Sequence, residues 1–189
     1  MGVAGTIAAT QVQHKDRRVS RVLRAPDLAG AFRGPGSFPI HSSTSSFMID
    51  VRQSGVHGRG AFAAQDLQVG QCIGIYEGRR YTARQAGRRD WDNNLTYVFG
   101  LTDGSVIDAA DGGNASRHLN HSCAPNCVAY EEPGPRGRPV VVFYALRDMR
   151  AGEEIFLDYS LHVDESDDRG AYSCACGAPV CRGTMLAAA

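Results

Sequence analysis

Three cysteines near the C-terminus have the spacing of metal ligands. Cys174, Cys176 and Cys181 form a C-x-C-x4-C pattern, and a glycine between the second and the third allows the chain to turn back. Zinc usually takes four ligands, so the trio lacks one. Three upstream residues are candidates for the fourth ligand: Cys123, Cys127 and His121. The pattern favours a structural zinc site, and a reduced trio without metal is the alternative.

A second cluster of chemically active side chains occupies residues 117–127, Arg-His-Leu-Asn-His-Ser-Cys-Ala-Pro-Asn-Cys. So many polar groups are costly to bury unless each is paired, which predicts a binding site or a tightly hydrogen-bonded corner. Either histidine alone fits an ordinary structural role. The segment 153–159, Glu-Glu-Ile-Phe-Leu-Asp-Tyr, ends in an acid–tyrosine pair, but alone it fits an edge strand.

A glycine-rich segment at residues 55–60, Gly-Val-His-Gly-Arg-Gly, is neither a P-loop nor a dinucleotide-binding fingerprint. It lacks the Gly-Lys-Ser/Thr ending, and no long helix follows it. It predicts a tight turn between strands, and its glycines also permit close approach of a ligand.

Short β-like runs, broken by glycines, must position these residues. The strand candidates are 47–51, 60–63, 72–76, 96–101, 105–107, 140–144 and 154–157. Helix signals are few: Thr82 can cap a helix over 83–87, and Asn114 can cap one turn ending near Leu119. The pattern predicts a mainly β domain with short helices.

The composition is that of a soluble globular chain, with 43% hydrophobic and 21% charged residues among 189. Its longest apolar runs are shorter than the ~18 residues of a membrane span. The formal net charge of zero divides into +4 for residues 1–46 and −4 for the remainder. The first 46 residues show no periodicity and predict a flexible basic arm. An organelle transit peptide is the weaker interpretation, because an amphipathic pattern is missing.

Taken in order, these segments resemble the SET-domain protein lysine methyltransferases followed by a C-terminal post-SET zinc segment. The resemblance covers about residues 51–186. It rests on eight motifs: G-x-x-G-R-G-x-F at 55–62, Tyr-Glu-Gly at 76–78, Tyr-Val-Phe at 97–99, Ile-Asp-Ala at 107–109, R-x-x-N-H-S-C-x-P-N at 117–126, Gly-Glu-Glu at 152–154, Asp-Tyr at 158–159 and C-x-C-x4-C-R-G at 174–183.

The resemblance implies a role for each matching residue. The residues implied to contact the cofactor S-adenosylmethionine are His57, Gly58, Arg59, Tyr97, Asn120 and His121. The implied catalytic residues, which include the tyrosines of the lysine channel, are Tyr76, His121 and Tyr159. One structural zinc ion would be held by Cys123, Cys174, Cys176 and Cys181, with Cys72 and Cys127 left as small buried hydrophobes.

The implied fold consists of small sheets around a pseudoknot, in which a C-terminal stretch threads through a loop, plus a zinc-bound tail. The threading would bring residues 120–123 beside Tyr159. We expect a flexible arm over 1–46, a SET domain over 47–162 and a post-SET segment over 163–189. The implied reaction is in-line methyl transfer to a lysine nitrogen, for which the protein supplies alignment and electrostatics.

The implied partner is a lysine-bearing basic protein, such as a histone tail or a histone-like protein. An acidic stretch supports a basic substrate: Asp164, Glu165, Asp167 and Asp168. Leu157 stands where relatives often have Phe or Tyr, and Ala129 where another tyrosine can occur, so we expect addition of more than one methyl group. The insert between Tyr81 and Thr96 is short, which leaves few residues to shape a peptide groove.

Two other functions stay open: a catalytically weak SET-like binding module for basic tails, and nucleic-acid binding by the arm. Intact Tyr76, Asn120 and Tyr159 oppose the first, while an acidic body and few aromatic residues in the arm make direct nucleic-acid binding the weaker hypothesis. We expect no membrane partner. The composition, 19 arginines and one lysine, is typical of a GC-rich genome. The chain is then cytoplasmic if bacterial and retained, or chromatin-associated if eukaryotic or delivered to a host.

Overall fold

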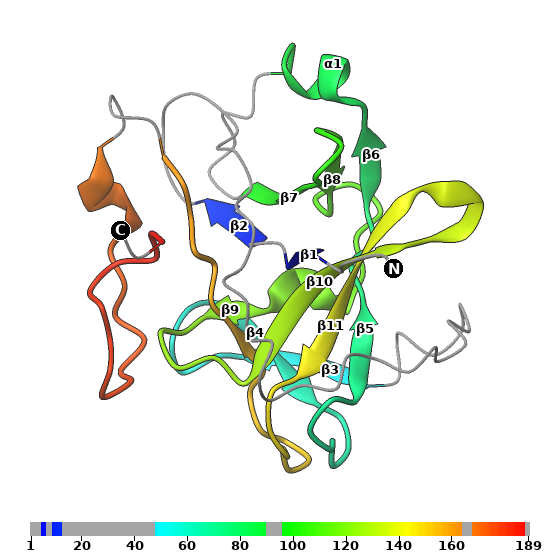
Figure 1. Ribbon diagram of the computed structural model, residues 1–189. Coiled ribbons are helices and arrows are strands. Elements are labelled where there is room, and N and C mark those ends of the chain that lie inside the picture. Colours follow the sequence, from blue (N-terminus) through cyan, green and yellow to red (C-terminus); the bar gives the residue numbers. More distant parts are fainter. Residues whose placement is uncertain (1–4, 7–8, 13–47, 90–95, 164–167, 188–189) are drawn as a thin grey trace.

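The protein folds as small β-sheets packed around a main apolar core, with a second, smaller apolar cluster beside α1 (Figure 1). The computed structural model describes residues 5–6, 9–12, 48–89, 96–163 and 168–187. Within these residues, the largest sheet has the order β5 (Cys72–Ile75), β11 (Pro139–Ala145), β10 (Cys127–Pro133), β12 (Phe156–Leu157) and β9 (Asn120–His121), with β1 (Gly5–Thr6) pairing β10. Because strands predominate over helices, the predicted mainly β class is confirmed.

Two smaller sheets complete the described part of the domain. One has the order β2 (Ala9–Val12), β7 (Thr96–Gly100), β8 (Val106–Asp108) and β6 (Arg79–Tyr81); the other pairs β3 (Ile49–Gln53) with β4 (Arg59–Ala63). The helical segments within the described residues are short: α1 (Ala83–Ala86) and the 3₁₀ turns η1 (Ala115–His118), η2 (Pro135–Gly137) and η3 (Arg169–Tyr172).

Local side-chain chemistry explains where the two predicted helices begin. The Thr82 side chain accepts the Gln85 backbone N–H, and the Gln85 side chain accepts the Thr82 N–H, a reciprocal capping box at α1. The Asn114 side chain accepts the Ser116 N–H at the start of η1. Both predicted caps are therefore confirmed.

The arm of residues 1–46 contributes two strands that its composition did not predict. Within it, β1 pairs β10 and β2 pairs β7, while residues 1–4, 7–8 and 13–47 lie outside the described part. The flexibility of the arm and the three domain boundaries stay predictions. In the described part, no helix is long and apolar enough to cross a membrane.

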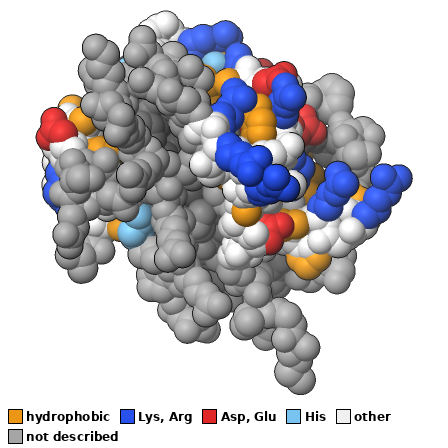
Figure 2. Space-filling view, turned by 90° about the horizontal axis from the view of Figure 1, so that it is seen from above, with side chains coloured by type: hydrophobic (Ala, Val, Ile, Leu, Met, Phe, Trp, Pro, Cys, Tyr) orange, Lys and Arg blue, Asp and Glu red, His pale blue; other side chains and the backbone are white. Residues whose placement is uncertain are grey.

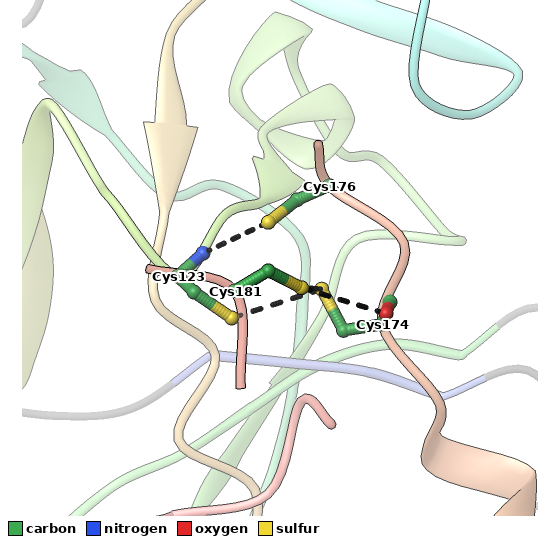
Figure 3. Close-up of side chains that lie close together, drawn as sticks. All are labelled: Cys123, Cys174, Cys176 and Cys181. Carbon is green, nitrogen blue, oxygen red and sulfur yellow. Dashed lines mark hydrogen bonds between the residues drawn. The ribbon is translucent and has the colours of Figure 1, made fainter. Parts of the chain in front are cut away.

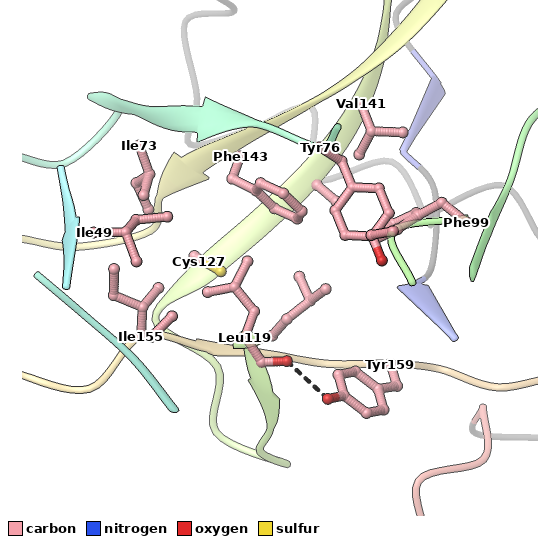
Figure 4. Packing of buried hydrophobic residues seen from close by; sticks show 14 of the residues in the cluster. Ile49, Ile73, Tyr76, Phe99, Leu119, Cys127, Val141, Phe143, Ile155 and Tyr159 are labelled. Atoms are coloured by element: carbon pink, nitrogen blue, oxygen red, sulfur yellow. Dashed lines mark hydrogen bonds between the residues drawn. The ribbon is translucent and has the colours of Figure 1, made fainter. Parts of the chain in front are cut away.

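The core lies where the sheets meet (Figure 4). Phe143 of β11, Ile73 of β5 and Ile107 of β8 each have at most 1% of their surface exposed. Cys127 is 1% exposed in this cluster, as predicted. Cys72, in contrast, is exposed, so its predicted burial is wrong. Its strand, β5, is an end strand of the large sheet and has a neighbouring strand on one side only. Residues of an end strand are therefore more accessible to solvent.

The central topological feature is that β12 lies between β9 and β10, parallel to both. Phe156 and Leu157 pair with Asn120 and His121 on one side, and Leu157 pairs with Cys127 on the other. The loop between β9 and β10 therefore surrounds a strand that comes much later in the chain. This arrangement confirms the expected approach of residues 120–123 to Tyr159.

Candidate active site

The glycine-rich turn between β3 and β4 forms one wall of the candidate site. The Ser54 hydroxyl accepts the backbone N–H groups of Val56 and His57, and Ser54 N donates to Gly58 O at 2.8 Å. Gly58 adopts φ +48°, a left-handed conformation that favours glycine. A Cβ at Gly58 would have no atom within 4 Å, so the turn is open in front of this residue.

Asn120 fixes this turn from the strand β9. Its side-chain amide donates to His57 O at 3.1 Å, to Arg59 O at 3.2 Å and to the Glu154 carboxylate at 3.0 Å. Asn120 is 4% exposed, so these acceptors replace the water that burial removes. The structure thus brings together His57, Arg59 and Asn120, three of the predicted cofactor residues.

Glu154 is a site residue that sequence reasoning missed. A Cβ placed on Gly60 would come within 2.2 Å of Glu154 Oε1, so the carboxylate occupies the space in which other residues have a side chain. The glycine at 60 and the Glu-Glu pair at 153–154 were both visible in the sequence. Their mutual contact could not be inferred, because more than 90 residues separate them in the chain.

Three tyrosines from separate segments, Tyr76, Tyr97 and Tyr159, lie close enough to interact electrostatically. The Tyr76 ring lies edge-on to Phe99, with 4.5 Å between ring centroids, and Tyr159 donates from its hydroxyl to Leu119 O at 2.7 Å (Figure 4). The pKa of Tyr159 is raised well above its ordinary value, mainly because the phenol is buried and next because the phenols of Tyr76 and Tyr97 are close. The pKa of Tyr76 is also raised well above its ordinary value, mainly by burial and next by the negative charge of Asp108. Both hydroxyls are therefore neutral at physiological pH.

His121 connects this tyrosine cluster to the cysteines. Its Nδ1 accepts the Tyr159 backbone N–H at 3.1 Å, and its Nε2 lies 3.4 Å from Cys123 Sγ. Burial lowers the pKa of His121 to about 4, although Asp158 opposes the shift. A neutral ring that accepts at Nδ1 carries its proton on Nε2, which then points to sulfur. His121 thus orients the backbone at Tyr159.

His118 is a second buried histidine, for which sequence reasoning offered only a structural role. Its Nε2 accepts from Arg117 Nε at 3.2 Å, and its ring packs 6.2 Å from the Tyr97 ring. Burial and the charges of Arg117 and Arg59 lower the pKa of His118 to about 4. Arg117 also lies over the Tyr97 ring, 5.6 Å from its centroid. These contacts hold the Tyr97 ring against His118 and Arg117.

The four predicted zinc ligands come together at one point (Figure 3). The sulfur atoms of Cys123, Cys174, Cys176 and Cys181 all lie within 4.8 Å of one another. Cys174 Sγ is 3.8 Å from both Cys123 Sγ and Cys181 Sγ. Zinc–sulfur bonds of ~2.3 Å in a tetrahedron place sulfur atoms about 3.8 Å apart, so these residues fit the metal.

Backbone donors favour the thiolate at Cys176, whereas burial raises the pKa values of Cys123 and Cys174. Arg182 N donates to Cys123 Sγ at 3.3 Å, and Cys123 N donates to Cys176 Sγ at 3.4 Å. Burial alone would raise the pKa of Cys176, but the N–H groups of Cys123 and Ala178 and the neighbouring thiols outweigh it and lower the value to about 6. Cys127 lies in the core instead, where burial strongly raises the pKa of its thiol.

An ion pair fastens the cysteine-bearing tail to the strand that leads to Tyr159. Both terminal nitrogens of Arg182 donate to the Asp158 carboxylate, each at 2.8 Å. Burial alone would raise the pKa of Asp158, but these bonds outweigh it and lower the pKa. Bidentate pairs of this kind fix orientation as well as distance. Neither Asp158 nor Arg182 was a predicted site residue, although both belong to recognised motifs.

The acidic stretch expected near the substrate lies mostly outside the described residues. Asp164, Glu165 and Asp167 belong to that undescribed part. Asp168 is described, and its carboxylate accepts the Gly170 N–H at 2.9 Å to cap η3. The role of this stretch in substrate binding stays a prediction.

Comparison with known proteins gives consistent matches. The SET domain family model matches residues 58–160. "Histone-lysine N-methyltransferase 2B" from Homo sapiens is 34% identical over 146 residues, which is 74% of this chain and 5% of that protein. "Histone-lysine N-methyltransferase, H3 lysine-4 specific" from Saccharomyces cerevisiae is 36% identical over 138 residues, or 70% of this chain and 13% of that protein.

A solved structure shows the same fold. A chain from an active polycomb repressive complex 2 in the basal state aligns with a TM-score of 0.53 and 30% identity, over 58% of this chain and 15% of that chain. The present chain thus spans a small part of the length of each relative. The family match ends at residue 160, before the three C-terminal cysteines.

Proposed function

The chain belongs to the SET domain family, and from that membership we propose that it is an S-adenosylmethionine-dependent protein lysine N-methyltransferase. One observation carries the proposal: Asn120 and His121 join the open glycine turn to Tyr159 across a pair of parallel strands. These are residues that a methyl-transfer site requires, and they come from three distant segments of the chain.

The turn and its neighbours fit the cofactor. Gly55 and Gly58 have open space where a Cβ would project, while the Arg59 side chain is exposed and suits a carboxylate. His57, Gly58, Arg59, Tyr97, Asn120 and His121 would hold S-adenosylmethionine. When bound, this cofactor supplies a methyl group already activated on a positive sulfonium.

The buried tyrosines would provide a neutral environment for the amine of the substrate lysine. A free lysine has a pKa of about 10.4, so its amine must become neutral to act as a nucleophile. Tyr76 and Tyr159 stay uncharged and buried, so they offer no anion that would retain the ammonium form. Because Tyr159 donates to Leu119 O, its oxygen lone pairs remain available to accept an N–H from the amine. Tyr159 would thereby orient the nitrogen.

The zinc ion has a structural role in this proposal. Cys123, Cys174, Cys176 and Cys181 would bind it and close the tail over the site. Four protein thiolates leave no open coordination position for a substrate. The metal would therefore stabilise the tail without taking part in methyl transfer.

We further propose that the substrate is a lysine in a basic, histone-like tail. The names of two relatives specify histone lysine as their substrate. In this chain, the acidic stretch at 164–168 supports a basic target. The second candidate, a binding module without catalysis, is disfavoured by the complete tyrosine, asparagine and histidine set.

Transfer of a labelled methyl group tests the proposal. The chain is incubated with S-adenosylmethionine labelled at the methyl group, together with core histones and, separately, a lysate of the source organism. We expect label on lysine in at least one basic protein and none with Asn120→Ala. Cofactor binding by titration without label in any substrate would instead support the binding module.

A further inference from the structure

Among the described residues, two segments carry several arginines and no acidic residue. Residues 79–89 contain five arginines, and the hairpin turn 135–138 contains two. The seven are Arg79, Arg80, Arg84, Arg88, Arg89, Arg136 and Arg138. The methyl-transfer proposal uses none of them, so their clustering needs a separate explanation.

The fold brings the two segments to one end of the molecule. Arg79 and Arg89 both lie over the Tyr81 ring, at 5.5 and 4.7 Å from its centroid, which joins β6 to the residues after α1. The pKa of Arg80 is lowered, mainly by burial and next by the positive charge of Arg138, which therefore lies close to it. We call the seven residues the arginine face. Figure 2 looks down on the α1 end of the molecule, where arginine side chains gather.

Part of this charge is neutralised and part is not. Arg79 pairs with Asp111 at 3.1 Å, Arg89 pairs with Asp108 at 3.7 Å, and Asp103 and Glu131 act on Arg80. Arg84, Arg88, Arg136 and Arg138 are exposed, and none of them takes part in the ion pairs between described residues. Counted over the described residues, the arginine face therefore has a positive excess around the end strand β6.

We propose that the arginine face binds the phosphate backbone of a nucleic-acid duplex, without regard to sequence. Guanidinium groups match phosphate oxygens in bidentate fashion, and contacts of this kind supply most non-specific affinity. A site for the duplex beside a site for a basic protein tail would suit a substrate that is itself bound to nucleic acid.

The surroundings of the face favour a duplex over other anionic partners. In the described residues, the exposed large hydrophobic side chains are Val56, Val69 and Val180, and none of these is on the arginine face. Protein interfaces normally have an apolar core, which is missing here. Single strands are usually held by stacking on exposed aromatic rings. Among the described residues, the ring that the arginines of the face contact is Tyr81, which is 8% exposed and covered by Arg79 and Arg89.

This site differs from the one considered in the sequence. The sequence analysis considered nucleic-acid binding by the N-terminal arm only, and it disfavoured such binding because the rest of the chain is acidic in total. The arginine face belongs to the body itself, and its charge is concentrated by the pairing of β6 with β8 and by the β10–β11 hairpin. Net charge alone could not reveal it, because residues 47–189 contain more acidic than basic side chains in total.

A pair of matched triple variants tests the proposal. The face variant carries Arg84→Gln, Arg88→Gln and Arg138→Gln, and the control carries Arg52→Gln, Arg150→Gln and Arg169→Gln, which are exposed arginines outside the arginine face. Binding of the full chain to a fluorescent 30-bp duplex of mixed sequence is measured from low to physiological salt. We expect the face variant to bind about tenfold more weakly at low salt, and log K to depend less steeply on log salt by about 2 to 3. The control should stay within about twofold of the wild type.

Three results of the duplex-binding measurement would overturn the proposal: no binding by the wild type, an equal loss of affinity in both triple variants, or wild-type affinity in both. The last result would place binding in the arm. Competition by polyglutamate as strong as by unlabelled duplex would also overturn the proposal in favour of an acidic protein. Thermal melts check folding of both variants. Should the face variant melt early, single Arg84→Gln and Arg138→Gln variants, each expected to weaken binding two- to threefold, carry the same comparison.

Discussion

Asn120 and His121 are neighbours in sequence but serve different parts of the site. Successive side chains of a strand point to opposite faces, so the amide of Asn120 meets the glycine turn while the ring of His121 meets Tyr159 and Cys123. Two residues thereby connect three segments. An exchange of their order would break both sets of contacts, because each side chain would then face the wrong partners.

Tyr159 is the residue on which the reaction should depend most. We predict that Tyr159→Phe lowers kcat by about a hundredfold or more, because the hydroxyl that orients the amine is lost. KM and cofactor affinity should change little. The variant should also lose about 1–3 kcal/mol of stability, since Leu119 O loses a buried donor. Steady-state kinetics and thermal melts measure the two effects separately.

The pH dependence distinguishes this role from general base catalysis by a tyrosinate. Since burial raises the pKa of Tyr159 well above its ordinary value, the wild-type rate should show no tyrosine ionisation at or below pH 9. An unchanged kcat in the phenylalanine variant would show that the hydroxyl has no part in the reaction.

Leu157 bears on how many methyl groups are added. Leu157 is 3% exposed and paired with Cys127 and His121, and the nearby Ala129 is small and 1% exposed. The Tyr144 hydroxyl, a possible substitute for a missing tyrosine, already donates to Glu132 at 2.7 Å. We predict that the wild type forms di- or trimethyl-lysine and that Leu157→Tyr stops mainly at monomethyl-lysine, as read by mass spectrometry at long times.

Leu157→Phe is the matched control, because it adds the ring without the hydroxyl. Both variants overpack the core by similar amounts, at a cost of about 1–3 kcal/mol. We expect Leu157→Phe to keep multiple methylation. Monomethyl-lysine alone from the wild type, unaltered in Leu157→Tyr, would show that this position does not control the product.

At the scale of elements, apolar runs and capping residues were good predictors. All seven predicted strands overlap an observed one, and Thr82 and Asn114 cap helical turns as expected. Besides β1 and β2, the strands β6, β9 and β10 were missed. Arginines in β6 and the Glu131–Glu132 pair in β10 hide the β pattern, and β9 is only two polar residues long. β10 is nevertheless paired along its whole length with β11, so tertiary pairing outweighed local composition.

The candidate site was predictable where motifs were recognised and less so where distant segments meet. The contact between Glu154 and Asn120 and the Asp158–Arg182 pair depend on the position of β12 between β9 and β10. Local propensity contains no information on such parallel pairings. The resemblance to a family implied the threading, but the individual contacts of these carboxylates required the fold.

The zinc site can be tested through the choice between two cysteines of one loop. We predict one zinc per chain in the wild type and in Cys127→Ala, and loss of metal in Cys123→Ala, because only the Cys123 sulfur lies within the four-sulfur cluster. Elemental analysis of the purified proteins measures this. A chelator should lower the melting temperature of the wild type and Cys127→Ala, but not that of Cys123→Ala.

Cys127→Ala is a suitable control because it removes a thiol without adding a polar group to the core. It leaves a small cavity among buried apolar residues, so we expect a modest loss of stability with metal retained. Metal loss in Cys127→Ala with retention in Cys123→Ala would mean that the fourth ligand has been assigned wrongly.

At the scale of the whole molecule, arginines and acidic residues are concentrated in different segments of the sequence. The arginine face surrounds β6 at the α1 end, whereas acidic residues dominate the stretch 164–168 between Tyr159 and the cysteine trio. A formal net charge of zero conceals this separation. Since electrostatic attraction falls off within about 10 Å at 0.1 M salt, we expect each segment to attract mainly the groups that come close to it.

We predict that the acidic stretch speeds capture of basic peptides. Neutralising Asp164, Glu165 and Asp167 together, by amide substitution, should raise KM for an arginine- and lysine-rich peptide at low salt, because the local field that attracts it is removed. The salt dependence of KM should flatten, and kcat should stay the same. Asp168 is left unchanged because it caps η3. Steady-state kinetics at several salt concentrations gives each value.

Three acids elsewhere provide the control for net charge. Asp50, Asp66 and Asp111 are exposed and have arginine partners, so their amide variants change the total charge equally without altering the stretch before the cysteines. If attraction is local, this control should leave KM near the wild-type value. A peptide with one lysine and no other charge should have the same KM with the wild type, the 164–167 variant and the control. An unchanged KM at low salt in the 164–167 variant would show that substrate capture does not depend on this stretch, since screening is then weakest.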